Sequence, residues 1–322
     1  MTFTLVGRGV DSTALFGYEQ TYGTVASTIT TVFGNGASIN VSLNNNTERL
    51  FALGARNAQK LVTKKLDVSW NADFALGNAY FMMAVLGTKG SESGGGPYAR
   101  TYSENNTIPS LSIRNAFNLD TDSQHTLLGA KINSMSLNCN VNEIAKVKLE
   151  GFAKEMVKTS TLGTTSSGDS EDPLIFSGAS IRLGSTTGLD VQSMEITIGN
   201  NLEMLGALGT RFATKAVEKQ REYTLTINEA YESDTLFLDN FLGSNTNSVT
   251  SPANLTELVA TFSNGLSSTF ERTLVATFTQ IQLPTYDYTL DINEIIKENA
   301  THWMLNCSGF KYTNNSTTSP AP

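Results

Sequence analysis

The chain has 322 residues and a formal net charge of −8, and only 16% of its residues are charged, against roughly 25% in an ordinary soluble domain. Most of its polarity comes from uncharged Ser, Thr and Asn, a composition typical of extracellular or virion β-proteins. The absence of any apolar run of about 20 residues predicts no membrane span. The acidic balance argues against a protein that grips nucleic-acid phosphates.

The first feature along the chain is one half of an internal repeat. Residues 38–64 align without gaps on residues 193–219, and thirteen of the 27 aligned positions are identical. A period of about 155 residues is too long for a solenoid, whose repeats span roughly 20–50 residues. A unit of that length is able to fold on its own, so the sequence predicts two copies of one domain.

After each repeated segment the sequence predicts a strand and then a short helix. Residues 66–71 and residues 223–228 alternate apolar and polar side chains, the period of a half-buried strand. Helices are expected over residues 77–86 and 233–242, each followed by a glycine in the position that commonly ends a helix. The same order of elements therefore occurs twice.

Further strands and a long loop complete the predicted elements. Alternating apolar residues predict strands over 135–141 and 145–149, separated by the polar pair Asn142-Glu143, and over 274–292 and 303–307. Residues 88–108 are rich in Gly and Ser and are expected to form a long loop, which in a compact domain is usually functional or disordered.

These elements predict a mainly β protein. We expect two tandem, duplicated antiparallel β-sandwich or β-barrel domains, each with one flanking α-helix. The expected boundaries are residues 1–158 for the first domain, 159–173 for a Ser/Thr/Gly/acidic linker, 174–312 for the second domain and 313–322 for a disordered tail.

The sequence offers little for catalysis. The only two histidines are His125, expected at the surface, and His302, expected to be structural; no nucleophile elbow, Walker loop or Rossmann fingerprint is present. Cys139 and Cys307 are too few for a four-ligand zinc site and are expected to be buried and free, with a bridge between them as the alternative. The acidic run 169–172 reads as solvated linker charge rather than a calcium site. We therefore expect no enzyme activity, no cofactor and no metal.

One pair of charges recurs in both repeats. Glu48 and Arg56 match Glu203 and Arg211 at identical spacing. This repetition indicates ion pairs, either within each domain or between neighbouring domains. The alternative is that these are independent surface charges left over from the duplication.

The order of several motifs resembles a known family, the major tail tube proteins of tailed viruses. The opening segment 10–24, with Glu19 followed by Tyr22, Gly23 and Thr24, is similar to the N-terminal strand of that family. The remaining motifs follow in the family's order: Leu86-Gly87 and Leu242-Gly243, 109–113, 128–137, 141–143 and 149–151.

The resemblance implies a structural virion protein of the tail. Members stack rings into a hollow tube through which genomic DNA passes into the host, and six domains surround the lumen. Two fused domains would let three chains form a pseudo-hexameric ring, which near-equal copies favour; a ring of six chains is the alternative. Other partners would be other tail proteins, with only transient, non-specific passage of DNA and no membrane, and assembly would take place in the host cytoplasm.

The resemblance also suggests which residues make contacts in the assembly, and two other functions remain as alternatives. The candidate interface residues are Glu48, Arg56, Glu203, Arg211 and, for ring-to-ring contact through the 88–108 loop, Ser91, Tyr98 and Arg100. The alternative function is another self-assembling shell, such as a surface-layer or spike protein. A carbohydrate-binding or hydrolytic protein would require a cleft with aromatic platforms or paired carboxylates, but the only tryptophans, Trp70 and Trp303, lie in strand patterns that predict a place in the core.

Overall fold

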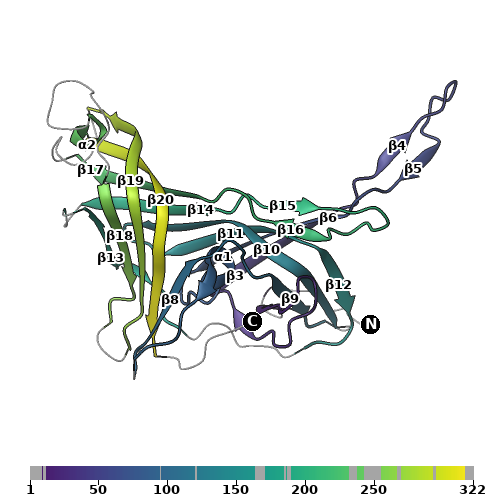
Figure 1. Cartoon of the computed structure of the whole chain (residues 1–322), viewed down its shortest axis with the longest axis horizontal. Coiled ribbons are helices and arrows are strands. Elements are labelled where there is room, and N and C mark those ends of the chain that lie inside the picture. Colours follow the sequence, from purple (N-terminus) through teal and green to yellow (C-terminus); the bar gives the residue numbers. More distant parts are fainter. Residues whose placement is uncertain are drawn as a thin grey trace, which may run out of the picture.

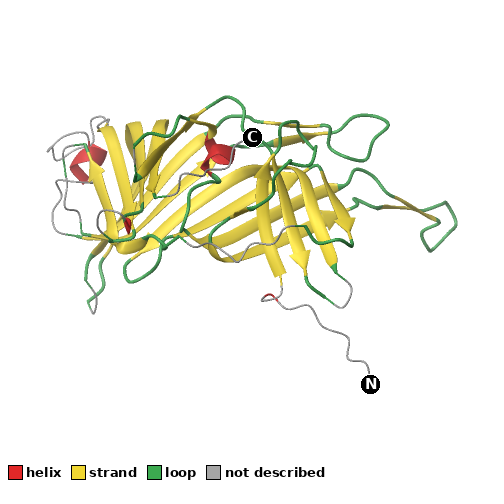
Figure 2. Cartoon of the chain, turned by 90° about the horizontal axis from the view of Figure 1, so that it is seen from below, coloured by secondary structure: helices red, strands yellow, loops and turns green. Residues whose placement is uncertain are grey.

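The computed structural model describes residues 9, 12–94, 96–119, 122–163, 171–184, 186, 190–231, 238–242, 255–266, 270–292 and 295–315. Over these residues the protein is mainly β, as predicted, with two five-residue helices (Figures 1 and 2). We call residues up to 163 the first half and residues from 171 the second half.

The strands of the first half surround helix α1 (Met82–Leu86). They are β1 (Ser12–Tyr18), β2 (Thr31–Val32), β3 (Asn35–Asn44), β4 (Glu48–Leu50), β5 (Lys60–Val62), β6 (Asp67–Ala75), β7 (Gly87–Lys89), β8 (Tyr98–Glu104), β9 (Leu111–Phe117), β10 (Ser123–Asn140), β11 (Lys146–Ala153) and β12 (Glu155–Thr159).

The second half contains helix α2 (Leu238–Leu242) and a similar series of strands. They are β13 (Ile175–Leu183), β14 (Val191–Gly199), β15 (Glu203–Leu205), β16 (Lys215–Val217), β17 (Glu222–Ala230), β18 (Leu255–Ser263), β19 (Thr273–Thr289) and β20 (Lys297–Asn314).

One antiparallel sheet runs through both halves. Its order is β13-β18-β19-β20-β17-β14-β10-β11-β6-β3, so the two halves join where β14 pairs with β10 (Figure 1). Outside this path, β9 pairs with β10 and with β1. The order β1-β9-β10-β11-β6-β3 in the first half thus matches β13-β18-β19-β20-β17-β14 in the second.

The repeated segments adopt the same pairings. Ser38 of β3 lies opposite Asp73 of β6, and Ser193 of β14 lies opposite Asn228 of β17, the equivalent residues of the repeat. Glu48 lies opposite Val62 in the first hairpin, and Glu203 lies opposite Val217 in the second. Local sequence identity therefore fixes the register of the strands as well as their existence.

The core lies on one face of the sheet. Alternate residues such as Ile196 and Ile198 of β14 and Leu225 and Ile227 of β17 are fully buried, as the period of two predicts. Helix α1 lies against this face and all five of its residues are buried. The opposite side chains of the same strands are mostly Ser, Thr and Asn.

The structure corrects three predictions. Residues 88–108 are not a simple loop: β7 and β8 form a hairpin, and β8 pairs with β20 of the second half. The first helix begins at Met82 rather than near residue 77: the residues before it form a turn, in which Asn78 accepts a hydrogen bond from the Tyr80 N–H and the Met82 N–H donates to the carbonyl of Ala79. The last strand continues to Asn314, which is buried, so the tail begins later than residue 313.

The end of the predicted linker is also firmly held. Glu171 forms an ion pair with Arg272 and accepts a hydrogen bond from Asn314 at 3.0 Å, and its carbonyl accepts one from Asn35 at 3.0 Å. The prediction of a solvated charge run is wrong at this residue. The expected residues Asp169 and Ser170 lie outside the described part of the chain, as do the predicted helix starts at Ser233 and Asp234.

Candidate assembly surfaces

The repeated segments form two hairpin arms. The first arm consists of β4 and β5, and the second arm consists of β15 and β16. In Figure 1 the first arm extends away from the rest of the chain, whereas the second lies alongside the sheet of the first half. The arms are therefore nearly identical hairpins in two different environments.

The recurring glutamates pair with lysines within their own arms. Glu48 forms an ion pair with Lys64, and Glu203 forms one with Lys219 at 2.6 Å. Both pairs are about half exposed, and ion pairs of this kind contribute roughly 0–1 kcal/mol. The duplicated charges are thus ion-paired as predicted, but to lysines at the base of each arm and not to Arg56 and Arg211.

Arg211 instead joins the second arm to the first half. Its Nη2 donates to Asn45 Oδ1 at 2.7 Å and its Nε donates to the carbonyl of Lys64 at 3.1 Å. Its own carbonyl accepts from the N–H of Leu66 at 2.9 Å. One arginine therefore makes three hydrogen bonds across the boundary between the halves.

A buried ion pair lies at the base of the same contact. Lys131 Nζ of β10 lies 2.5 Å from Glu218 Oε1, and Glu218 also accepts from the N–H of Ile108 at 3.1 Å. Burial raises the pKa of Glu218, but the hydrogen bonds from Lys131 and Ile108 outweigh it and lower this pKa below its usual value. Glu218 is therefore held ionised at the junction.

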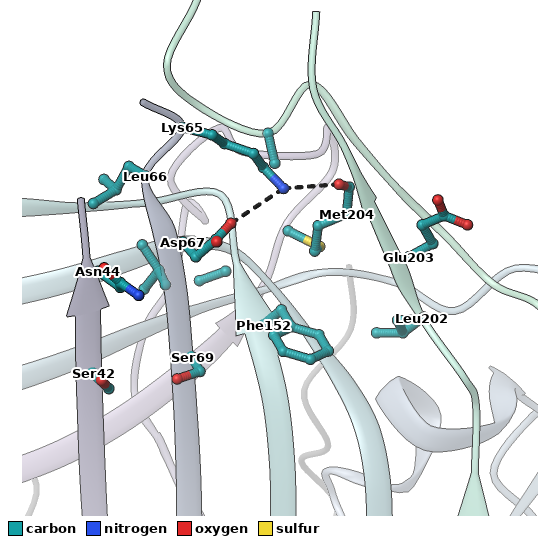
Figure 3. Close-up of a pocket in the computed structure, with 13 residues that line it drawn as sticks. Ser42, Asn44, Lys65, Leu66, Asp67, Ser69, Phe152, Leu202, Glu203 and Met204 are labelled. Carbon is teal, nitrogen blue, oxygen red and sulfur yellow. Dashed lines mark hydrogen bonds and ion pairs between the residues drawn. The ribbon is translucent and has the colours of Figure 1, made fainter. Parts of the chain in front are cut away.

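Between the second arm and the first half lies a groove of about 470 Å³ (Figure 3). Phe152 of β11 and Met204 of β15 line it, and Lys65 bridges its two sides. The Lys65 ammonium donates to the carbonyl of Met204 at 2.9 Å and lies 3.2 Å from a carboxylate oxygen of Asp67. The lining is mixed polar and apolar, as expected of a contact between two parts of an assembly rather than a closed ligand pocket.

The comparison with protein families now gives an identity. The family model described as "Phage tail tube protein" matches residues 9–291. The chain belongs to the phage tail tube family. A comparison with curated proteins found no match. Over the described residues of this tail tube protein, no helix is long and apolar enough to cross a membrane, and no cluster of three metal-ligating side chains is found.

The motif that carried the family resemblance forms a buried cluster in this tail tube protein. Glu19 is buried and its carboxylate accepts four hydrogen bonds, from the N–H groups of Gly23 and Gly129, both at 2.8 Å, and from the hydroxyls of Ser110 and Ser112, at 2.7 and 2.9 Å. Glu19 therefore ties the segment after β1 to β9 and β10. The sequence showed the motif but not this role.

The predicted ring-to-ring residues lie on the β7–β8 hairpin of the tail tube protein. Ser91 is exposed and Tyr98 is partly exposed. Arg100 is buried: its Nε donates to Glu92 Oε1 at 2.9 Å, and a second nitrogen donates to Asn314 Oδ1 at 2.5 Å. The Arg100 side chain thus holds the hairpin on β20, and within this chain only the other two residues are at the surface.

The uncovered face of the main sheet is largely polar in this tail tube protein, but Trp303 and Leu305 of β20 are 60% and 72% exposed on it, so the expectation that Trp303 lies in the core is wrong. Ser134, Ser136 and Asn138 of β10 are continued by Thr197 and Glu195 of β14 in the same rows. Among the described residues, the charged side chains that alternation places on this face are the acids Asp67, Asp73, Glu150, Glu195, Glu222, Glu257 and Asp287 and the bases Lys146, Lys148, Arg182, Lys297 and Lys311. Acids therefore outnumber bases there.

Sequence reasoning missed several of these features. Lys131 lies in the 128–137 motif and Glu218 lies in the repeated segment 193–219, but no local signal in the sequence pairs them. The difference between the two arms was hidden because their sequences are so similar. The acidic residues of the polar face could have been predicted from the sequence, since strand alternation assigns each of them to that face once the strands are known.

Proposed function

We propose that this tail tube protein is a structural subunit that assembles with itself into stacked rings, and that genomic DNA passes through the lumen of the resulting tube. The observation that carries this proposal is the contact of the second arm and β14 with the first half, together with the open position of the first arm and β3. The second arm and β14 already contact another half of the chain, whereas the equivalent first arm and β3 do not. A chain of this kind is suited to cyclic assembly.

The polar face of the sheet is our candidate lining of the lumen. Its short hydroxyl and amide side chains offer no cationic patch, and its acids outnumber its bases. Carboxylates repel DNA phosphates and leave the duplex free to slide, because strong binding needs Lys and Arg contacts to the phosphates. The proposed mechanism is geometric and electrostatic, with no bond made or broken.

We also propose that the chain holds two copies of one tube domain, residues 1–158 and 174–314, linked by 159–173. The matching strand orders and registers of the two halves support this division. Three such chains would supply the six domains of a pseudo-hexameric ring. Contacts with other tail proteins and assembly in the host cytoplasm belong to the same proposal.

Electron microscopy of concentrated protein tests the function. Long hollow cylinders with a repeat along the axis support it. Flat lattices or separate spikes would instead favour another self-assembling shell, such as a surface-layer protein. The mass of a dissociated ring distinguishes three chains from six, and a sixfold mass would overturn the three-chain ring.

A further inference from the structure

We infer that the tip of the first arm docks on the base of the second arm of a second copy through Arg56, as the tip of the second arm docks on the base of the first arm within the chain. The tips are residues 51–58 and 206–213, and the bases are residues 45–46 with 64–66 and residues 200–201 with 219–221. The inference rests on the proposed tube function, because it specifies a contact between neighbouring chains of a ring.

The two arms are built alike from base to tip. Each begins at an asparagine with positive φ, Asn46 at 47° and Asn201 at 46°, whose amide donates a hydrogen bond across the base. Each tip turns at a glycine with positive φ, Gly54 at 81° and Gly209 at 89°. A hydrogen bond of 2.8 Å closes both hairpins, from the N–H of Gln59 in the first arm and from that of its equivalent in the second. The contact made by one tip is therefore a template for the contact of the other.

The tip of the second arm supplies that template. Arg211 Nε donates to the carbonyl of Lys64 at 3.1 Å, and Arg211 Nη2 donates to Asn45 Oδ1 at 2.7 Å. The Leu66 N–H donates to the Arg211 carbonyl at 2.9 Å. All three hydrogen bonds join a tip to a base, and two of them use backbone groups of the base, which any residue type provides.

Arg56 occupies the equivalent position in the first arm. It is exposed, and within the described part of the chain it forms neither a hydrogen bond nor an ion pair. The backbone groups equivalent to those of Lys64 and Leu66 are the carbonyl of Lys219 and the N–H of Arg221, and neither is hydrogen-bonded to any described residue. We therefore place Arg56 Nε against the Lys219 carbonyl of the second copy, with the Arg221 N–H donating to the Arg56 carbonyl.

One hydrogen bond of the template does not carry over. Asn200, the equivalent of Asn45, is 2% exposed, and its Oδ1 accepts from Arg221 Nε at 2.8 Å within the chain. Arg221 thus takes the place at the second arm that Arg211 takes at the first. The contact of Arg56 is therefore expected to keep the two bonds to backbone groups.

Another pair of equivalent residues supplies a third bond. The Lys65 ammonium donates to the carbonyl of Met204 at 2.9 Å beneath the second arm (Figure 3). Gln220 stands at the position of Lys65 and Arg49 at that of Met204, so the Gln220 amide is placed to donate to the Arg49 carbonyl. The charges around both bases also balance, so the incoming Arg56 meets no net positive charge. They are Glu48, Lys64, Lys65 and Asp67 at the first base and Glu203, Lys219, Arg221 and Glu222 at the second.

The side chains left exposed at both surfaces agree with this contact. Ala216 of the docked second arm is 9% exposed, whereas its equivalent in the first arm, Leu61, is 69% exposed. Phe152 lines the groove under the second arm (Figure 3). The equivalent residue of the second half, by its pairing with β17, is Trp303, and it is 60% exposed. A docked first arm would cover Leu61 and Trp303 as the second arm covers Ala216 and Phe152.

The contact is head-to-tail, since it joins a tip to a base. Such contacts close into rings when the rotation between copies permits. Each chain already holds one tip on one base and presents a second tip and a second base. In a three-chain ring, the six arms would therefore form a continuous collar in which every tip lies on the next base.

Paired cysteines beside the contact test it in the full-length protein. In Asn57→Cys/Lys219→Cys, one thiol lies next to Arg56 in the sequence and the other lies at the base that Arg56 is expected to contact. A short bismaleimide added to the assembled protein should join neighbouring chains into dimers and trimers on denaturing gels. The native thiols should not react, because burial raises the pKa of Cys139 and raises that of Cys307 to about 12.

A matched pair within one chain calibrates the reaction. Lys64→Cys/Phe212→Cys occupies the equivalent positions of the observed contact, so it should cross-link within the chain and give no larger species. Species that join two chains in Asn57→Cys/Lys219→Cys support the proposed contact. Their absence, when the pair within the chain reacts, would overturn it.

Two further variants test the contact without cross-linking. Arg56→Ala alters an exposed side chain, so the unfolding of the single chain should stay unchanged, whereas the protein concentration needed for assembly should rise by about tenfold because a charged hydrogen bond is lost. Lys60→Ala removes the same charge from the same arm. Its equivalent Lys215 is exposed in the docked second arm, so Lys60→Ala should assemble as the wild-type chain does. Light scattering against concentration measures both.

The arm contact and the tube function fail in different ways. Equal assembly thresholds for Arg56→Ala and Lys60→Ala would overturn the arm contact and leave the tube function standing. Failure of the wild-type chain to form tubes would instead overturn the proposed function.

Discussion

Lys131 of β10 and Glu218, which follows β16, form an ion pair across the two halves of the chain, with 2.5 Å between Nζ and Oε1. Both side chains are largely buried, so each depends on the other for neutralisation. The pair fixes the second arm against the strand that joins the halves.

Removing one member of this pair should destabilise the chain. We expect Lys131→Met to lower the free energy of unfolding by about 3 kcal/mol, because Glu218 is left buried without its partner. Lys131→Met/Glu218→Leu should recover much of the loss, since no charge then remains buried. Urea unfolding at pH 7 measures both; equal losses in the single and double variants would show that the ion pair is unimportant.

The same pair predicts an acid dependence. The pKa of Glu218 is lower in the folded chain than its usual value of 4.5, so its stabilising contribution is complete above pH 4.5 and is lost as the pH falls through the folded value. Glu218→Gln should therefore show a smaller fall in stability below pH 4.5 than the wild-type chain. Urea midpoints between pH 6 and pH 3 provide the comparison.

His302 predicts a pH effect in a higher range. Burial lowers its pKa from 6.5 to about 4, so the folded state resists protonation while the unfolded state accepts it. Stability should be greatest above pH 6.5 and fall by about 2–3 kcal/mol on acidification to pH 4.5 from this residue alone. His302→Leu should lose that part of the acid dependence, measured as the difference in unfolding free energy between pH 7 and pH 4.5.

Glu19 should be among the residues most sensitive to substitution. Its carboxylate accepts four hydrogen bonds while buried, and hydrogen bonds to charged groups contribute roughly 1.5–3 kcal/mol each. We expect Glu19→Ala to lower the free energy of unfolding by about 3 kcal/mol or more. Glu150→Gln, which alters an exposed ion pair, should change it by less than about 1 kcal/mol.

The two equivalent arginines should behave differently. Arg211→Ala removes hydrogen bonds to Asn45 and Lys64 and should lower the stability of the single chain by about 1 kcal/mol. Arg56→Ala should leave the unfolding of the single chain unchanged and raise the protein concentration needed for assembly. Light scattering against concentration and urea unfolding separate the two effects; equal behaviour of both variants in both assays would contradict the asymmetry.

The polar face predicts a response to charge reversal. Asp73→Lys/Glu195→Lys should make assembled tubes bind linear duplex DNA, with an affinity that falls steeply as salt is raised. Asp73→Asn/Glu195→Gln should bind much less, because it adds no cations. Retention of DNA by tubes on sedimentation is the measurement, and binding by the wild-type tubes equal to that of the lysine variant would contradict the lumen assignment.

The sequence was most informative where physical signals are local. The repeat predicted the same order of strand and helix after both repeated segments, and alternation placed the side chains of β6 and β17 on the correct faces, but the two hairpin arms were not predicted. The junction of the halves was not predictable, since pairing of β14 with β10 depends on which edges remain open after folding. The β7–β8 hairpin was not predicted because the Gly and Ser content of residues 88–108 indicated a loop. The inward position of Arg100 is explained by its hydrogen bonds to Glu92 and Asn314.

The open edge of β3 gives the free subunit a direction. β3 and β13 lie at opposite ends of the strand order, so a growing ring of the proposed kind would have unlike ends. A subunit whose β3 edge is blocked would join the ring through its other end only and stop further addition. When such a blocked subunit is mixed in small proportion with the wild-type chain, the fraction of closed rings should fall by much more than the fraction of blocked subunits.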